Sequence, residues 1–154
     1  MTRLIAIGTR IGNDAIALRL IEEMAPELRH CHSDLEINYC EQPGQELLHR
    51  FDPETPTLLV DALAGEGADG SVIEIDPAEL LENPRPLSTH EVSVAGALQL
   101  AQALGMLPRE LAVFGIAADP RQPLEANKIE RARGELRDAL RKHAIFARAA
   151  VTTL

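Results

Sequence analysis

The sequence predicts an α/β fold in one domain spanning residues 1–154: a three-layer α/β/α sandwich around a mostly parallel central sheet, with one strand expected to be antiparallel. Two observations predict this class. Short apolar runs of strand character alternate with segments whose apolar residues recur at helical spacing, which is typical of a parallel sheet covered by helices on both faces. The composition is 45% hydrophobic but only 3% aromatic, with no tryptophan, so we expect a core of aliphatic side chains.

The first half of the chain is expected to contain two strands and two helices before the central strand. The run Arg3–Gly8 predicts a short buried strand. Asn13 is expected to cap a helix that ends near Pro26, because proline cannot continue a regular helix. Leu35–Tyr39 alternates apolar and polar residues, as half-buried strands near a sheet edge do. A short helix is expected over Gly44–Phe51.

The second half begins with the central apolar strand, Thr57–Leu63. A strand at Ser71–Ile75 follows after so short a connection that we expect it to pair antiparallel. The remaining expected elements are a helical turn at Ala78–Leu81 within the loop Asp76–Thr89, a helix marked by Val94 to Leu104 that ends at Gly105, a last strand at Glu110–Ile116, and an amphipathic helix from about Glu125 to Ala149.

Charge and composition exclude several classes of protein. The net charge is −9, and the 15 lysines and arginines are scattered outside the C-terminal helix, which argues against a nucleic-acid surface. No apolar run is long enough to cross a bilayer, and the N-terminus lacks the pattern of a signal peptide. The two cysteines do not make a disulfide framework. We therefore expect a soluble cytoplasmic protein without membrane insertion.

Three side chains follow predicted strands or precede predicted helices and could meet at one edge of the sheet. Asp61 is the most informative, because it lies at the end of an apolar strand, and burying an ionised carboxylate costs several kcal/mol unless something pairs with it. Asp14 follows the first strand, and His90 precedes the helix that begins near Val94. Ligands bind at the carboxyl ends of strands in open α/β sheets. Two carboxylates and an imidazole would suit zinc, nickel or manganese.

Each of these residues also has a purely structural interpretation. Asp14 would interact with the dipole of the first helix, Asp61 would accept backbone N–H groups in the following turn, and His90 would form local hydrogen bonds at a helix start.

Two other motifs are weaker. Gly8–Gly12 lacks the glycine pattern of a nucleotide-binding loop, and Asp14 would repel a phosphate. The sequence His30-Cys31-His32, taken with Cys40, lacks the paired spacing of a zinc site, so we expect a helix–strand connection with semi-buried cysteines.

Asp14, Asp61 and His90, in this order and next to the strands and the helix named above, resemble the pattern of the hydrogenase maturation endopeptidases. These enzymes trim the C-terminal tail of the [NiFe]-hydrogenase large subunit. The resemblance rests on Gly12-Asn13-Asp14-Ala15, on Leu59-Val60-Asp61-Ala62, on Ser88-Thr89-His90-Glu91 and on Phe114-Gly115-Ile116. The chain departs from the family where Ala15 and Ala17 replace glycines. It also departs where Cys40-Glu41-Gln42-Pro43 replaces a glycine-threonine motif linked to substrate recognition, and where Ala118-Asp119-Pro120 replaces a frequent Glu-Pro ending.

The resemblance implies a metal-dependent endopeptidase whose Asp14, Asp61 and His90 are both the catalytic residues and the metal ligands. The metal would be nickel supplied by the substrate, with zinc or cadmium as substitutes, and the partner would be a [NiFe]-hydrogenase large-subunit precursor. Glu91 and Asp119 are the candidates for a helping acid or base. The alternative is an inactive or divergent member that binds the nickel-loaded subunit without cutting it. A nucleotide-binding protein is disfavoured by Asp14.

Overall fold

The computed structural model describes residues 1–10, 12–64, 67–82 and 91–147. A five-stranded sheet runs through the centre in the order β2-β1-β3-β5-β4. Its strands are β1 (Thr2–Ile7), β2 (Leu35–Cys40), β3 (Thr57–Leu63), β4 (Val72–Ile75) and β5 (Leu111–Ala117). All neighbouring strands pair in parallel except β4, which is antiparallel to β5. The predicted class, a mostly parallel α/β sheet with one antiparallel strand, is confirmed.

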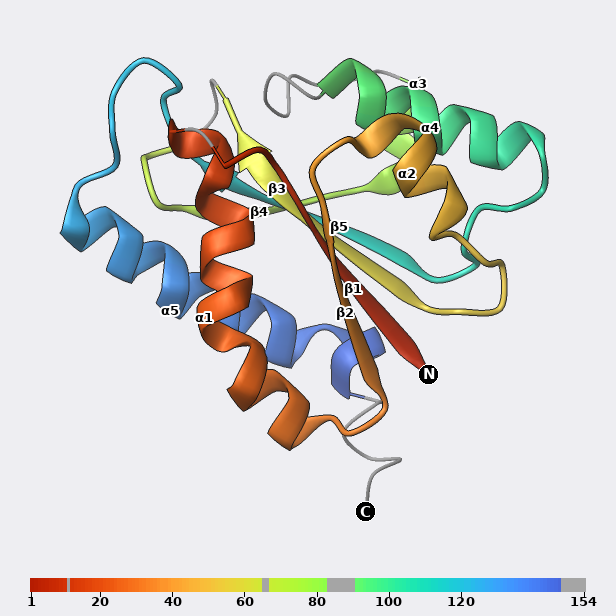
Figure 1. The fold of residues 1–154 in the computed structure, drawn as a ribbon, viewed down its shortest axis with the longest axis horizontal. Coiled ribbons are helices and arrows are strands. Elements are labelled where there is room, and N and C mark those ends of the chain that lie inside the picture. Colours follow the sequence, from red (N-terminus) through yellow and green to blue (C-terminus); the bar gives the residue numbers. More distant parts are fainter. Residues whose placement is uncertain (11, 65–66, 83–90, 148–154) are drawn as a thin grey trace.

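Helices cover both faces of the sheet (Figure 1). On one face lie α1 (Ile16–Cys31) and α5 (Ala126–Lys142), and on the other lie α2 (Pro43–His49), α3 (Pro77–Glu82) and α4 (Glu91–Ala103). A short 3-10 helix, η1 (Gly12–Ala15), joins β1 to α1. No described helix is both long enough and apolar enough to cross a bilayer.

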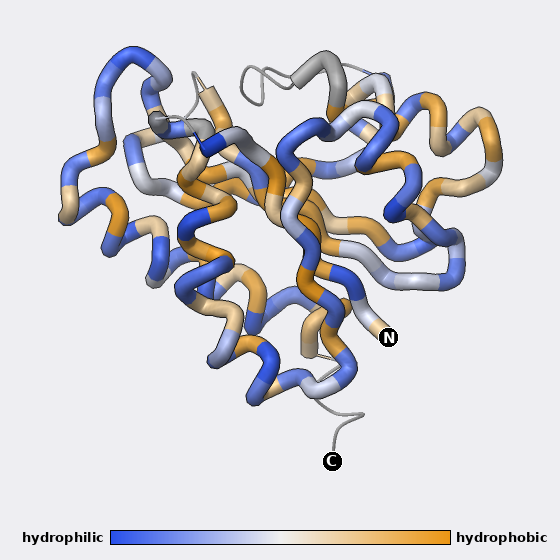
Figure 2. The backbone as a smooth tube through the Cα atoms, viewed as in Figure 1, coloured by the Kyte–Doolittle hydropathy of each residue, from blue (hydrophilic) through white to orange (hydrophobic). Residues whose placement is uncertain are grey.

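The core consists of two aliphatic layers, one on each side of the sheet. Alternate residues of β3 belong to different layers: Leu58, Val60 and Ala62 pack towards α1 and α5, whereas Leu59 and Leu63 pack towards α2 and α4. This alternation follows from the period of two in a strand. Apolar residues accordingly concentrate along the central strands, and hydrophilic ones line the outer faces of the helices (Figure 2).

The prediction that α1 ends near Pro26 is wrong. Pro26 lies inside α1, which continues to Cys31. Pro26 is on the exposed face of the helix, so the backbone carbonyl that loses its partner can be hydrated, while Met24 and Leu28 remain buried on the other face. Burial of this apolar stripe outweighs one missing hydrogen bond.

Asn13 was predicted to cap α1, and this prediction is also wrong. The residue before α1 is Ala15, and no side chain caps the helix. Asn13 belongs to η1, and its amide binds a loop more than 100 residues away in sequence.

The other differences concern the ends of elements. The last helix, expected from about Glu125 to Ala149, is interrupted: α5 ends at Lys142, where the backbone of His143 is extended. A further helical turn follows over 144–147 and buries Ile145 and Phe146, and Ala149 lies outside the described residues. Gly105 ends α4 as predicted: its φ is +69°, and the Met106 N–H donates to the Ala101 carbonyl at 2.8 Å.

Candidate functional site

The carboxyl ends of the four parallel strands meet at one edge of the sheet. The connection from β1 leads to β2 on one side, while β3 pairs with β1 on its other side, so the order of the strands reverses at β1. This reversal is the position where open α/β sheets bind ligands. The segments that follow β1 and β3 therefore form the candidate site.

Asp61 lies at this edge and is almost completely buried, with 1% of its surface exposed. It occurs between Leu59 and Leu63 on the face of β3 that packs towards α2 and α4, as the alternation of the strand requires. One carboxylate oxygen, Oδ1, accepts the N–H of Ala62 at 2.8 Å. A carboxylate held inside an aliphatic layer is costly, so its retention needs a functional or structural reason.

Of the other two predicted ligands, the structure describes the backbone of Asp14 only and no part of His90. Asp14 belongs to η1, which lies next to β3, so its backbone is at the expected edge of the sheet, whereas its side chain is outside the described part of the structure. His90 lies entirely outside the described residues, and so does the side chain of Glu91. Among the side chains that are described, no three His, Cys, Asp or Glu residues are grouped to hold a metal. The convergence of Asp14, Asp61 and His90 stays a prediction.

Asp119, the other candidate helper, follows β5 in the loop 118–125 that leads to α5. Its carboxylate accepts the backbone N–H of Arg121 at 2.9 Å and pairs with the guanidinium of the same residue at 3.2 Å. These hydrogen bonds hold the pKa of Asp119 below its usual range. The carboxylate is therefore a weak base, and nothing in its contacts assigns it a catalytic role.

The four residues considered for a zinc site do not come together as a set. Cys31 is exposed at the end of α1, and Cys40 is buried at the end of β2, so neither is semi-buried as expected. Burial, together with the charges of Glu46 and Asp61, raises the pKa of the Cys40 thiol to about 12. His32 is buried, and its ring meets Phe146 edge-on with 3.8 Å between centroids. Burial, with a smaller effect from Arg141, lowers the pKa of His32.

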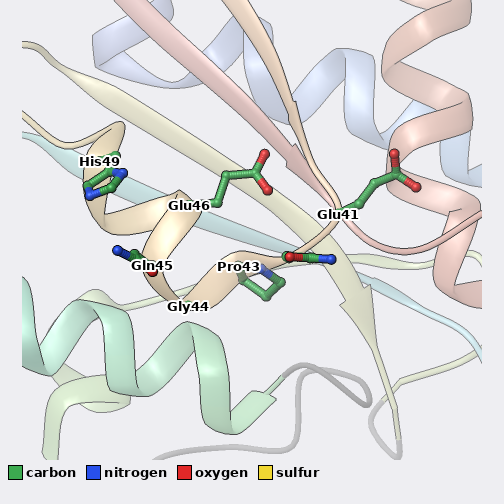
Figure 3. A pocket seen from close by; sticks show the side chains of 7 residues that line it. Glu41, Pro43, Gly44, Gln45, Glu46 and His49 are labelled. Atoms are coloured by element: carbon green, nitrogen blue, oxygen red, sulfur yellow. The ribbon is translucent and has the colours of Figure 1, made fainter.

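A hollow that the sequence did not reveal opens beside the end of β2 (Figure 3). It has a volume of about 730 Å³ and is lined by Glu41, Gln42, Pro43, Gly44, Gln45, Glu46 and His49. Gly44, one of the lining residues, has a non-helical backbone near the start of α2. Cys40, the last residue of β2, pairs with Ile7 of β1, and β1 pairs in turn with β3, so the hollow begins two strands away from the carboxyl end of β3.

Comparison with solved structures identifies proteins of the same fold. The hydrogenase maturating endopeptidase HybD from Escherichia coli superposes with a TM-score of 0.65 at 22% identity, covering 92% of this chain and 93% of its own. A second Escherichia coli endopeptidase, solved in solution, has a TM-score of 0.70 at 23% identity and the same coverage. The [NiFe] hydrogenase maturation protease HycI from Thermococcus kodakarensis has a TM-score of 0.60 at 22% identity, covering 95% of this chain and 92% of its own.

The chain therefore has the fold of the hydrogenase maturation endopeptidases. The likeness extends over nearly the whole of both chains. No protein-family model matches the sequence, and no curated protein matches it. At these identities the comparison shows the fold alone.

Proposed function

We propose that this protein is an endopeptidase that removes the C-terminal extension of a [NiFe]-hydrogenase large-subunit precursor after nickel insertion. The observation that carries the proposal is the buried carboxylate of Asp61 at the end of the central strand, in a chain whose fold is that of hydrogenase maturation endopeptidases. A membrane partner and a nucleic-acid partner form no part of the proposal. A cytoplasmic location stays a prediction.

In this proposal Asp14, Asp61 and His90 recognise the nickel that the substrate presents. Carboxylate oxygens and an imidazole nitrogen suit nickel, and zinc or cadmium would substitute for it. The buried carboxylate of Asp61 fits this role because it is held in a dry layer, where its charge attracts a cation more strongly than it would in water. Its Oδ1 is oriented by the N–H of Ala62. Binding would then hold the scissile peptide bond in a fixed place beside these residues.

The hollow at the end of β2, two strands from Asp61, has room for a polypeptide segment. The hollow beside β2 carries two carboxylates, Glu41 and Glu46 (Figure 3). Glu41 lies 3.8 Å from the guanidinium of Arg10, whereas Glu46 forms no ion pair with any described residue. A substrate tail leaving the nickel could extend over this surface.

A binding module that recognises the nickel-loaded subunit without cutting it is the second candidate. The observation that favours it is the first turn, where Ala15 directly precedes α1 and Asn13 is engaged by a distant loop. One experiment separates the two functions. The protein is incubated with a large-subunit precursor, with and without nickel, and the mass of the precursor is then measured by mass spectrometry.

The endopeptidase proposal predicts loss of a short C-terminal peptide only from the nickel-loaded precursor. A stable complex without any loss of mass would favour the binding module. No complex and no cleavage would refute both functions.

A further inference from the structure

Asn13 makes a set of hydrogen bonds that ties η1 to the loop 118–125. Its amide nitrogen Nδ2 donates to the carbonyl oxygen of Asp119 at 2.6 Å and also to that of Gln122. Its oxygen Oδ1 accepts the N–H of Leu124 at 3.2 Å. Both ends of the amide are therefore bound by backbone groups of one loop, and none of these bonds is made to the turn in which Asn13 itself lies.

The loop is a structured partner for this amide. The carboxylate of Asp119 accepts the N–H of Arg121, and the N–H of Gln122 donates to the Asp119 carbonyl at 3.3 Å. The carbonyl groups that receive Asn13 are thus presented by a turn that has its own internal hydrogen bonds. Such a turn can hold the bound side chain in one position.

Side-chain packing between the two segments is incomplete, although Leu124 packs against the core layer that contains Ile16. A hollow of about 220 Å³ lies between the two segments, lined by Gly12, Asn13, Ala15, Ile16, Arg19, Pro123, Leu124 and Ile129. The hydrogen bonds of the Asn13 amide bridge the two segments beside this space. Removing the amide would leave η1 free to shift into the hollow.

We propose that Asn13 is a positioning residue, which fixes the backbone of η1 and with it the neighbouring residue Asp14 at the carboxyl edge of the sheet. This inference rests on the proposed function, in which Asp14 is a ligand. Outer residues that orient a metal ligand typically change affinity or activity by about 10- to 100-fold when they are replaced. Asparagine is suited to this place because one planar group supplies two donors and an acceptor.

The test compares Asn13→Leu, which keeps a similar volume without polar atoms, with Asn127→Leu, a control at an exposed asparagine in the first turn of α5. Hydrogen exchange of the Leu124 amide reports on the bond to Asn13. We expect this exchange to become at least about tenfold faster in Asn13→Leu and to stay unchanged in the control.

Function is measured on the same two variants by kcat and KM for the nickel-loaded precursor and by cadmium affinity in calorimetry, at a temperature where melting curves show both variants folded. We expect kcat and cadmium affinity to fall about tenfold or more in Asn13→Leu, with KM changed less than kcat. A residue that served stability alone would lower the melting temperature and leave both values unchanged in the folded protein.

Faster exchange with unchanged kcat and cadmium affinity would overturn the positioning role, and unchanged exchange would show that the hydrogen bond is absent. If the wild-type protein neither cleaves the precursor nor binds cadmium, the proposed function fails and the positioning role fails with it. If the wild type cleaves and Asn13→Leu cleaves equally well, only the positioning role is wrong.

Discussion

Gly115 allows β5 to approach β3 beside Asp61, and replacing it by alanine should destabilise the protein. Gly115 pairs with Asp61 across the two strands. A Cβ atom at position 115 would lie 2.9 Å from the Cβ of Leu63 and 3.0 Å from its Cδ2. Because the nearest atom is a Cβ, a change of the Leu63 rotamer cannot remove the contact. The backbones of the two strands would have to separate.

The expected size of the effect follows from two opposing terms. Overpacking a core costs about 1–3 kcal/mol. Replacing glycine by alanine restricts the unfolded chain and returns about 0.4–1 kcal/mol. Taking the middle of each range, the free energy of unfolding should therefore fall by about 1.3 kcal/mol. At about 2–4 °C per kcal/mol for a chain of this size, the melting temperature should fall by about 3–5 °C.

The assay is urea unfolding and thermal melting of Gly115→Ala beside a matched control, Gly134→Ala. Gly134 lies inside α5, and a Cβ there would meet no atom within 4 Å. Alanine should stabilise that helix by up to about 1 kcal/mol. If Gly115→Ala proves as stable as the wild type, the close approach of β5 to Leu63 is wrong.

Two further predictions concern buried groups with shifted pKa values. Burial, with the charges of Glu46 and Asp61, raises the pKa of the Cys40 thiol to about 12. Iodoacetamide at pH 8 should therefore modify the exposed Cys31 and leave Cys40 unmodified until the protein unfolds, as measured by peptide mass mapping. Equal labelling of both cysteines would contradict the burial of Cys40. Because burial lowers the pKa of His32 in the folded state, the unfolded chain takes up the proton first, so the free energy of unfolding should decrease as the pH falls below about 6.5. His32→Leu should make this loss of stability at low pH smaller, whereas His30→Leu, at an exposed position, should leave it unchanged. The measurement is the free energy of unfolding in urea at pH 7 and at pH 5.5 for each variant.

The order and type of the elements could be predicted from the sequence because their signals are local. The apolar run Thr57–Leu63 is the central strand β3 with the same bounds, and Gly105 ends α4 as its position suggested. The predicted helix end at Pro26 was wrong because proline as a helix breaker is a local signal, whereas the burial of Leu28 in the same helix depends on packing against the sheet.

The features that could not be predicted depend on groups that are distant in sequence. Asn13 has the residue type of a helix cap, and only the folded chain shows that its partners lie in the loop 118–125. The hollow beside β2 is lined by residues of α2 whose backbone is non-helical at Gly44, and a single glycine in the sequence does not indicate such a conformation. The position of Asp61 was predictable, since an apolar run that ends in an acid marks a strand end in an α/β sheet.

The central claim is that Asp61 is retained to recognise nickel, and Asp61→Asn tests it most directly. The amide oxygen of asparagine can still accept the N–H of Ala62, and the buried charge is removed, so the free energy of unfolding should stay within about 1 kcal/mol of the wild type or rise. Asp61→Ala, which leaves that N–H without its acceptor, should lose about 1–3 kcal/mol and serves as the structural control.

The decisive measurement is the rate at which Asp61→Asn, shown by melting to be folded, cleaves the nickel-loaded precursor. Since a neutral amide is a poor metal ligand, we expect the rate to fall at least about 100-fold below that of the wild type. Cleavage at the wild-type rate by a folded Asp61→Asn protein, or loss of cleavage only in proportion to unfolding, would contradict the assignment of Asp61.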